Sequence, residues 1–294
     1  MRIFCLLVFL TSTSFAQDFS RTIDVLGEQR EYIVHLPLNN IANKKHPLVL
    51  AFHGGGGSAK HSLAFFGLNE VSDTAGFIVV YPNGLNKGWN DGRVIKNHTH
   101  DDIRFITLLL EQLKKDYSID EKKVFATGIS NGGFFSFSLA LHLSNKIRAI
   151  APVCASIPET IFQNYNPPKP VSLLLINGTE DPLVPYNGGK IGGRLLKRGQ
   201  CSSTIETVKK FILMNQCDPK PTTYSFPDKD VTDECKAKRF SYSCENGNQV
   251  QLIRIEGGGH TWPGGKQYLG KRLVGKVCRD FSAATEVWSF FRSF

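Results

Sequence analysis

Six short apolar runs, each rich in Val, Ile or Leu, alternate along the chain with segments of helical spacing. The runs occupy residues 46–54, 76–82, 122–128, 147–155, 171–178 and 250–259. Runs that are apolar on both faces are typical of buried parallel strands, because helices cover both faces of such a sheet. The alternation therefore predicts an α/β fold with a mostly parallel central sheet and helices on both faces.

Helical spacing is clearest in three of the intervening segments, residues 62–76, 101–118 and 131–144. Asp101 or Asp102 is placed to cap the second of these helices. Residues 21–37 differ from the rest, because their apolar residues alternate with period two around Gly27. This pattern predicts an antiparallel hairpin at one edge of the sheet.

Residues 1–16 have the pattern of a secretory signal peptide, with one basic residue, a short apolar run and a small-x-small ending at Ser14–Ala16. We expect cleavage after Ala16 and a secreted or periplasmic protein. No later segment approaches the roughly twenty consecutive apolar residues of a membrane-spanning helix, so stable membrane insertion is not expected. Residues 17–294 contain no repeat or linker and predict a single domain.

The chain carries 35 Lys+Arg and 26 Asp+Glu, for a net charge of +9. Its basic residues are scattered singly or in pairs, without the interleaved aromatic residues of nucleic-acid binders. A nucleic-acid partner is therefore not expected, and the sequence leaves the oligomeric state open.

Cysteine usage favours disulfides over a metal site. Cys5 leaves with the expected signal peptide, and the mature chain keeps Cys154, Cys201, Cys217, Cys235, Cys244 and Cys278. An even number of cysteines in an exported chain without a C-x-x-C motif is typical of disulfide bonding. Four of them lie between residues 201 and 244. This clustering predicts that disulfides hold this region together in place of a hydrophobic core of its own.

Ser130 lies in the motif Gly128-Ile129-Ser130-Asn131-Gly132, where an expected strand meets an expected helix. Small residues around a serine allow the sharp turn of a nucleophile elbow, although an ordinary structural turn is the alternative. The four glycines that follow His53 favour the catalytic interpretation. Their backbone N–H groups, at Gly55 and Gly56, can join that of Asn131 in an oxyanion hole.

His260 is the best-placed general base, because it follows the last expected strand in a glycine-rich loop, "GGGHTWPGG". His53 is expected to belong to the scaffold of the oxyanion loop. Asp181, at the end of "INGTED", is the expected partner of His260, and an Asx-turn aspartate is the alternative.

The order Ser130, Asp181, His260 is that of the α/β-hydrolase triad. Ser130 would attack an ester carbonyl, and His260 would take its proton and later activate water. This mechanism needs no metal and no organic cofactor.

The chain resembles the secreted polyhydroxybutyrate depolymerase and feruloyl esterase group, related to carbohydrate esterase family 1. The matching segments are "FHGGGGSA", "YPNGLNKGWNDGR", "DDIRFI", "VFATGISNGG", "INGTEDPLVPYNGG", "GGGHTWPGG" and "AATEVWSFF". The resemblance implies an ester substrate, possibly polymeric, and places Ser130, Asp181 and His260 on the triad positions of the group. It also implies a Cys217–Cys244 pair and leaves open how the other cysteines pair.

Trp89 and Trp262 are candidates for an apolar wall around the acyl group, with core packing as the alternative for each. Two other functions remain to be weighed against esterase activity: a peptidase on the same fold and a non-catalytic relative that binds a polymer. The sequence leaves the natural ester open, whether a hydroxyalkanoate oligomer or a feruloyl or acetyl polysaccharide ester.

Overall fold

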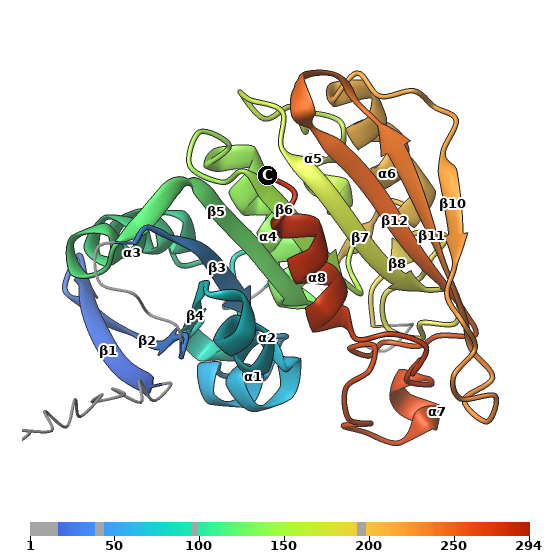
Figure 1. Ribbon diagram of the computed structural model, residues 1–294, viewed down its shortest axis with the longest axis horizontal. Coiled ribbons are helices and arrows are strands. Elements are labelled where there is room, and N and C mark those ends of the chain that lie inside the picture. The colour runs from blue at the N-terminus through green and yellow to red at the C-terminus, as the bar shows by residue number, and fades with distance from the viewer. Residues whose placement is uncertain (1–16, 39–43, 96–98, 193–197) are drawn as a thin grey trace, which may run out of the picture.

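The structure, a computed structural model, describes residues 17–38, 44–95, 99–192 and 198–294. The expected signal peptide, residues 1–16, lies outside the described residues. Within them, ten strands form one sheet in the order β1-β2-β4-β3-β5-β6-β7-β12-β11-β10 (Figure 1). Helices pack on both faces of this sheet, so the expected α/β architecture is confirmed.

The centre of the sheet is parallel throughout. Its strands, in spatial order, are β4 (Ile78–Pro82), β3 (His46–Phe52), β5 (Ile119–Ile129), β6 (Ala149–Val153), β7 (Ser172–Gly178) and β12 (Gln249–Glu256). Alternate side chains of β3 enter two different cores, with Leu50 on one face and Val49 on the other. These strands need apolar residues at every position because both faces are covered.

The expected hairpin at the edge of the sheet is confirmed. It consists of β1 (Gln17–Val25) and β2 (Glu28–Leu36), which pair antiparallel along their whole length. Leu26 and Gly27 connect them with φ angles of 56° and 86°. Two consecutive positive φ angles are typical of the tight turns that match strand twist.

The opposite edge contains elements that the sequence patterns did not reveal. β11 (Lys236–Ser243) pairs antiparallel with β12, and β10 (Thr222–Ser225) pairs with β11. All four residues of β10 are exposed, so no alternation of apolar and polar residues marks it. Helix α6 (Thr204–Met214) precedes them and packs on the sheet. Residues 201–244, which were expected to be held by disulfides without a core of their own, therefore extend the central sheet.

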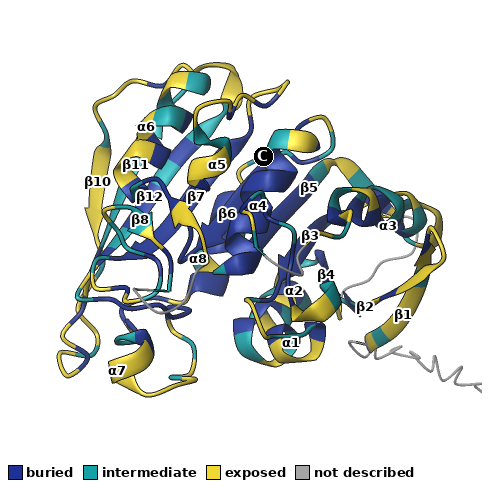
Figure 2. Ribbon diagram, turned by 180° about the vertical axis from the view of Figure 1, so that it is seen from behind, coloured by how far each residue is buried: buried dark blue, intermediate teal, exposed yellow. Residues whose placement is uncertain are grey.

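In the part of the chain that the structure describes, three of the longer helices cover each face of the sheet. One face carries α3 (Asp102–Asp116), α4 (Asn131–His142) and α6, and the other carries α1 (Ala59–Phe66), α2 (Leu68–Ala75) and α8 (Ala283–Phe291). Figure 2 shows that α4 and the central strands are almost entirely buried. The short elements are η1 (Leu85–Lys87), α5 (Glu159–Phe162), β8 (Gly189–Lys190), β9 (Gln200–Cys201), η2 (Glu245–Gly247) and α7 (Lys271–Val274).

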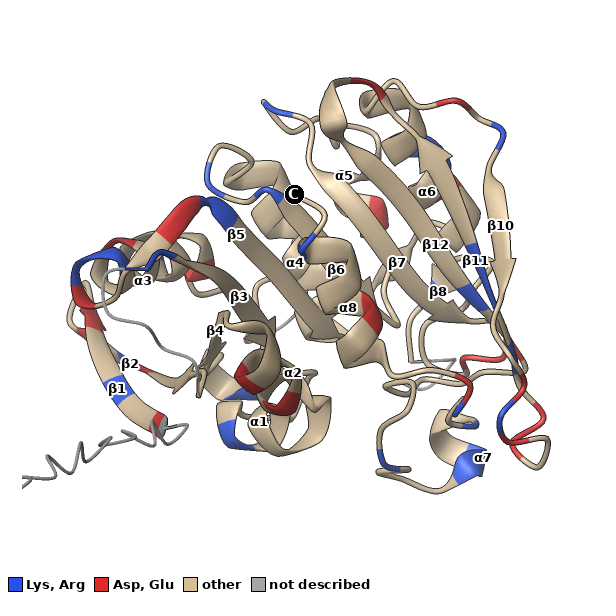
Figure 3. Ribbon diagram, in the orientation of Figure 1, with Lys and Arg blue, Asp and Glu red and all other residues tan. Residues whose placement is uncertain are grey.

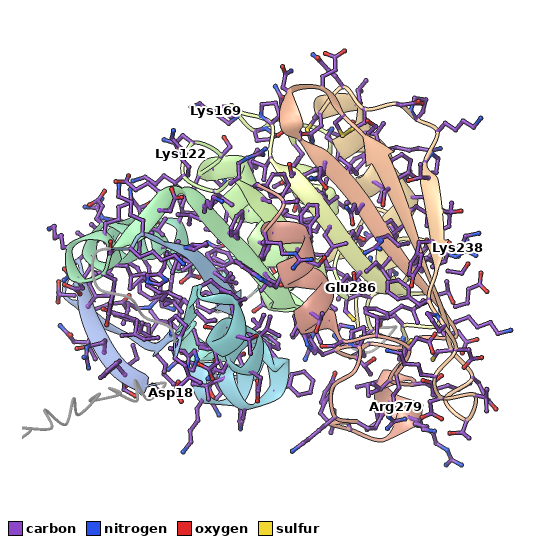
Figure 4. The ribbon with its side chains drawn as sticks, viewed as in Figure 1. Asp18, Lys122, Lys169, Lys238, Arg279 and Glu286 are labelled. Carbon is purple, nitrogen blue, oxygen red and sulfur yellow. A yellow bond between two sulfur atoms is a disulfide. The ribbon has the colours of Figure 1, made fainter. Side chains whose placement is uncertain are left out.

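Charged groups are dispersed over the ribbon (Figure 3). Glu286, labelled on α8 in Figure 4, accepts a hydrogen bond from Arg239 of β11 at 2.7 Å and so ties that helix to the edge of the sheet. Among the described residues, no helix has the length and apolar character required to cross a membrane.

Candidate active site

Ser130 occupies a strained turn between β5 and α4. Its φ and ψ angles are 55° and −121°, a combination that non-glycine residues rarely adopt. The turn is possible only with glycine on either side. A Cβ atom at Gly128 would lie 2.6 Å from the carbonyl oxygen of Phe52, and one at Gly132 would lie 2.2 Å from the same oxygen. The two glycines thus let β3 approach the elbow closely, which explains their positions in the motif.

The glycine run after β3 lies against this elbow. A Cβ atom placed on Gly54 would be 3.6 Å from the Cβ atom of Ser130, and one on Gly55 would be 3.7 Å from that of Asn131. Gly55 therefore lies beside Asn131, the first residue of α4. The N–H of Gly56 donates to the carbonyl oxygen of Lys87 at 2.7 Å. The expectation for Gly56 is corrected: this amide holds the loop and is not free to bind an oxyanion.

His53 holds the same loop in place. Its Nε2 accepts a hydrogen bond from the N–H of Gly84 at 3.0 Å, and its Nδ1 lies 2.8 Å from the carbonyl oxygen of Gly54. These contacts suit a neutral ring with the proton on Nδ1. Burial lowers the pKa of His53 to about 4, so the ring stays neutral near pH 7. The expected scaffold role fits this geometry.

The side chain of Asn131, the first residue of α4, is fixed by a buried polar network. Its Oδ1 accepts from the N–H of Trp89 at 2.8 Å, and its Nδ2 donates to the carboxylate of Asp91 at 2.6 Å. Asp91 in turn forms a buried ion pair with Arg93 at 2.5 Å. The segment "GWNDGR" was recognisable in the sequence, but only the tertiary structure shows that Asp91 and Arg93 position Asn131.

Asp181 and His260 meet at the carboxyl ends of β7 and β12. Nδ1 of His260 lies 2.7 Å from Oδ2 of Asp181, and both side chains are buried. The other carboxylate oxygen accepts from the N–H groups of Leu183 and Val184, each at 2.8 Å. The Asx-turn and the contact with His260 are therefore compatible, because each uses a different oxygen of the same carboxylate.

The loop that carries His260 is held by α7 and by the segments on either side of it. Gly259 donates its N–H to the carbonyl oxygen of Lys276 at 2.9 Å, and Tyr268 donates its hydroxyl to the carbonyl oxygen of His260 at 3.1 Å. A Cβ atom at Gly259 would lie 2.3 Å from the carbonyl oxygen of Val274. The glycine at position 259 therefore serves close packing.

Cys154 connects the Ser130 turn with the His260 loop, and no sequence signal marked it. It directly follows Val153, whose carbonyl oxygen accepts the N–H of Ser130 at 2.9 Å. Its thiol donates to the carbonyl oxygen of Thr261 at 3.2 Å. Burial and the nearby Asp181 carboxylate raise the pKa of the Cys154 thiol, so it remains a protonated donor. Its φ of 51° is a second unusual backbone angle at this edge of the sheet.

Trp89 and Trp262 are both buried, with exposed fractions of 0% and 1%. The indole N–H of Trp89 donates to the carbonyl oxygen of His53, and that of Trp262 donates to the carbonyl oxygen of Phe66, each at 3.0 Å. The ring of Trp262 also stacks on that of Phe66, with centroids 4.3 Å apart. This arrangement favours core packing, the alternative to an acyl-binding wall, for both residues.

The two aspartates before α3 have separate roles. Asp101 caps the helix by accepting the N–H of Arg104 at 2.9 Å. Asp102 accepts the N–H of Asn90 at 2.8 Å and pairs with Arg30 at 2.6 Å, both side chains being buried. Asp102 thus holds the loop that contains Trp89 against the edge hairpin.

Cys217 and Cys244 form a disulfide, as the resemblance implied. The other cysteines of the described residues are unpaired and buried: Cys154, Cys201, Cys235 and Cys278.

Residues 37–211, more than half of the chain, match the family model described as "Phospholipase/Carboxylesterase". A relative called "Putative esterase NocK", from Nocardia uniformis subsp. tsuyamanensis, is 28% identical across 94% of this chain and 83% of its own length. A "Probable feruloyl esterase C" from Aspergillus niger is 29% identical across 65% of this chain and 63% of its own length.

A third relative, "Bifunctional acetylxylan esterase/xylanase XynS20E" from Neocallimastix patriciarum, is 27% identical across 80% of this chain and 31% of its own length. The chain thus spans less than two thirds of the length of the last two relatives. Among solved structures, an acetyl xylan esterase from Aspergillus awamori has a TM-score of 0.55 at 17% identity, over 83% of this chain and 94% of its own. The two proteins share the fold.

Proposed function

The chain belongs to the phospholipase/carboxylesterase family and is an esterase of the α/β-hydrolase type, and from this premise we propose that it is an exported serine esterase. Ser130 is the nucleophile, His260 the general base and Asp181 the residue that orients the base. Export follows from the signal-peptide pattern of residues 1–16. Edman sequencing of the exported chain should begin at Gln17.

The contact between His260 and Asp181 carries this proposal. With Nδ1 held 2.7 Å from the carboxylate, the proton stays on Nδ1 and Nε2 is left to accept the proton of Ser130. The buried carboxylate then stabilises the imidazolium that forms. The strained turn at Ser130 supports the same assignment. A nucleophile elbow places its serine in such a turn, directly before the first residue of a helix, and Ser130 directly precedes α4.

Catalysis proceeds in two steps. In the first, the Ser130 oxygen bonds to the ester carbonyl carbon, and the alcohol leaves with the proton that His260 received. In the second, water gives a proton to His260, its oxygen attacks the acyl-enzyme, and the acid is released as Ser130 recovers its proton. The N–H groups of Asn131 and Gly55 hold the negative oxygen of each tetrahedral intermediate.

The proposed substrates are feruloyl or acetyl esters of polysaccharides. This choice rests on the names of the relatives, feruloyl esterase C and acetylxylan esterase. Hydroxybutyrate oligomers, which the sequence motifs also suggest, are the competing substrate class. A panel of methyl ferulate, acetylated xylan and hydroxybutyrate dimer, compared by kcat/KM, distinguishes them.

The nucleophile is tested with a fluorophosphonate probe and peptide mass spectrometry. The label should be found on Ser130 and should be lost in Ser130→Ala. Ser138→Ala, which replaces a buried serine of α4, is the matched control and should keep the label. Labelling of a different serine contradicts the mechanism. Failure to turn over any ester while hydrolysing a peptide anilide favours the peptidase alternative, and no turnover of either favours the non-catalytic one.

A further inference from the structure

Cys235 and Cys278, two buried cysteines with exposed fractions of 1% and 0%, lie in segments that pack against each other. Cys235 directly precedes β11, and Cys278 follows α7 (Figure 1). The Cys278 sulfur lies within 4.8 Å of a carboxylate oxygen of Asp233, and the Cys235 thiol donates to the carbonyl oxygen of Asp233 at 3.4 Å. Both sulfur atoms therefore lie beside Asp233, although they are not bonded to each other.

Two carboxylates fix the backbone on both sides of this thiol pair. Asp233 accepts the N–H of Cys235 at 2.8 Å through one oxygen and the N–H of Arg279 at 2.7 Å through the other. Arg279 is the residue after Cys278 and is labelled in the lower part of Figure 4. Asp233 is therefore hydrogen-bonded both to Cys235 and to the residue that follows Cys278.

Asp280 makes a second connection of the same kind. Its two oxygens accept the N–H groups of Lys229 and Ala237, at 3.2 and 3.1 Å. Asp233, Cys278 and Asp280 are close enough together to resemble a metal site. The oxygens of both carboxylates, however, are already occupied by backbone N–H groups. The cluster is better explained as a clamp that holds two segments in register.

The clamp is continuous with the loop that carries His260. The carbonyl oxygen of Cys278 accepts the N–H of Gly264 at 2.8 Å, and that of Lys276 accepts the N–H of Gly259 at 2.9 Å. An ion pair between Glu234 and Lys276 joins the same two segments at the surface. The segment around Cys278 therefore packs against the His260 loop. A covalent bond between Cys235 and Cys278 would attach this segment to β11 at the edge of the sheet.

We propose that Cys235 and Cys278 form a disulfide when the chain folds in an oxidising environment. The inference goes beyond the proposed esterase function and concerns a covalent modification of the scaffold. Two thiols that both lie beside Asp233, on backbones that Asp233 and Asp280 hold, need only a short approach to reach the sulfur–sulfur bond length of about 2.05 Å.

The oxidant is a disulfide, such as glutathione disulfide or an oxidised dithiol protein. The thiolate of one cysteine attacks a sulfur of the oxidant, which displaces one thiolate and leaves a mixed disulfide. The second cysteine then attacks the protein sulfur of that mixed disulfide. The protein loses two electrons and two protons, and the oxidant gains them as two thiols.

The exchange takes place before the segments are fully packed. In the folded dithiol, the neighbouring Cys235 thiol and burial hold the pKa of the Cys278 thiol well above its usual range. The attacking thiolate is therefore almost absent once the cluster has closed. The disulfide, once formed, is protected from reductants by the same burial.

The test is refolding of the denatured, reduced chain in a mixture of reduced and oxidised glutathione, which does not depend on export or on esterase activity. Free thiols are then alkylated in denaturant, and the chain is digested without reduction. Mapping should find Cys235 linked to Cys278 and, in the mature chain, only Cys154 and Cys201 alkylated. Alkylation of both Cys235 and Cys278, or a bond from either to another cysteine, overturns the proposal.

A second measurement uses the double variant Cys235→Ser/Cys278→Ser. The oxidised wild type should melt roughly 8 °C higher than this variant, because the disulfide closes a long loop in the unfolded chain. Cys201→Ser, another buried unpaired cysteine, controls for the replacement of a thiol by a hydroxyl. A reductant in denaturing preincubation should lower the Tm of the wild type more than that of the double variant. An equal effect on both contradicts the proposal.

Discussion

At the scale of single residues, the candidate site depends on backbone angles that side chains of neighbouring elements hold in place. Ser130 and Cys154 both have positive φ angles, of 55° and 51°, at the ends of adjacent strands. Such angles cost free energy and persist only where the surroundings impose them. The thiol of Cys154 supplies one such constraint, because it binds the His260 loop through Thr261.

Replacement of Cys154 tests this positioning role. Cys154→Ala removes the donor to the Thr261 carbonyl oxygen and should lower kcat up to about tenfold, the effect of one lost hydrogen bond on the placement of His260. Cys154→Ser keeps a donor and should recover most of the loss. Rates of fluorophosphonate labelling at Ser130 report on the same effect independently of substrate binding. Equal rates in the wild type and both variants would show that the thiol only fills space.

His53 makes stability depend on pH. Its pKa is about 4 in the folded protein because of burial, against 6.5 in the unfolded chain. As the pH falls from 6.5 to 4, the unfolded state takes up a proton that the folded state excludes, so the free energy of unfolding decreases. The loss from this residue should total roughly 3 kcal/mol and should stop below pH 4.

The measurement is guanidinium unfolding between pH 8 and pH 4, for the wild type and for His53→Gln. Subtracting the two curves removes the contributions of other titrating groups. The difference should be constant above pH 6.5 and should change steadily below it. A flat difference over the whole range would mean that His53 is not held neutral by its surroundings.

At the scale of elements, two loops are anchored by buried indoles. Trp89 fixes the loop after β4 to His53, and Trp262 fixes the loop after β12 to the last turn of α1. Each indole combines a stacked ring with an occupied N–H group. Both are therefore connections between elements, and their removal should affect the whole fold.

Trp262→Ala should lower the free energy of unfolding by about 3–5 kcal/mol, the usual cost of removing a buried aromatic ring. Any effect on kcat/KM should be the same factor for acetyl, butyryl and feruloyl esters. Trp262→Phe keeps a ring beside Phe66 and should cost less. Thermal melts together with the ester panel decide the matter. A change of ester preference at unchanged Tm would restore the acyl-wall interpretation.

At the scale of the whole molecule, strand order determines which loops can meet. β5, β6, β7 and β12 are consecutive neighbours in the sheet, all parallel. Their carboxyl ends therefore lie along one edge and bring Ser130, Cys154, Asp181 and the His260 loop together. The antiparallel strands β11 and β10 extend the sheet beyond this edge and are tied back by the Cys217–Cys244 disulfide.

In this arrangement, the Cys217–Cys244 disulfide is expected to contribute to the free energy of unfolding and not to the proposed reaction at Ser130. Cys217→Ala/Cys244→Ala should lower the free energy of unfolding by roughly 3 kcal/mol, since the disulfide closes a loop with a sequence separation of 27 residues. The kcat/KM for any ester should stay unchanged below the melting transition, because Ser243, next to Cys244, pairs with Gln249 at the amino end of β12, whereas His260 follows the carboxyl end. Urea unfolding and steady-state kinetics on the same preparation check both parts. A parallel loss of activity in the folded variant would contradict the separation.

The sequence by itself determined the features that depend on local patterns. Continuous apolar runs identified the central strands, because a strand covered on both faces has no polar side. The glycines around Ser130 identified the turn, because a side chain at Gly128 or Gly132 would overlap Phe52. Each of Ser130, Asp181 and His260 follows an expected strand, so their order along the chain could be compared with that of the α/β-hydrolase triad.

Only the tertiary structure decided the features that depend on distant partners. Gly56 and Gly55 are equivalent in the sequence, but the carbonyl oxygen of Lys87 occupies the N–H of Gly56 alone. β10 was not predicted, because its exposed residues show no alternation of apolar and polar side chains. The positions of Asp91, Cys154 and Trp262 are set by residues far away along the chain. No local pattern encodes such contacts, because they form only when the sheet brings its strand ends together.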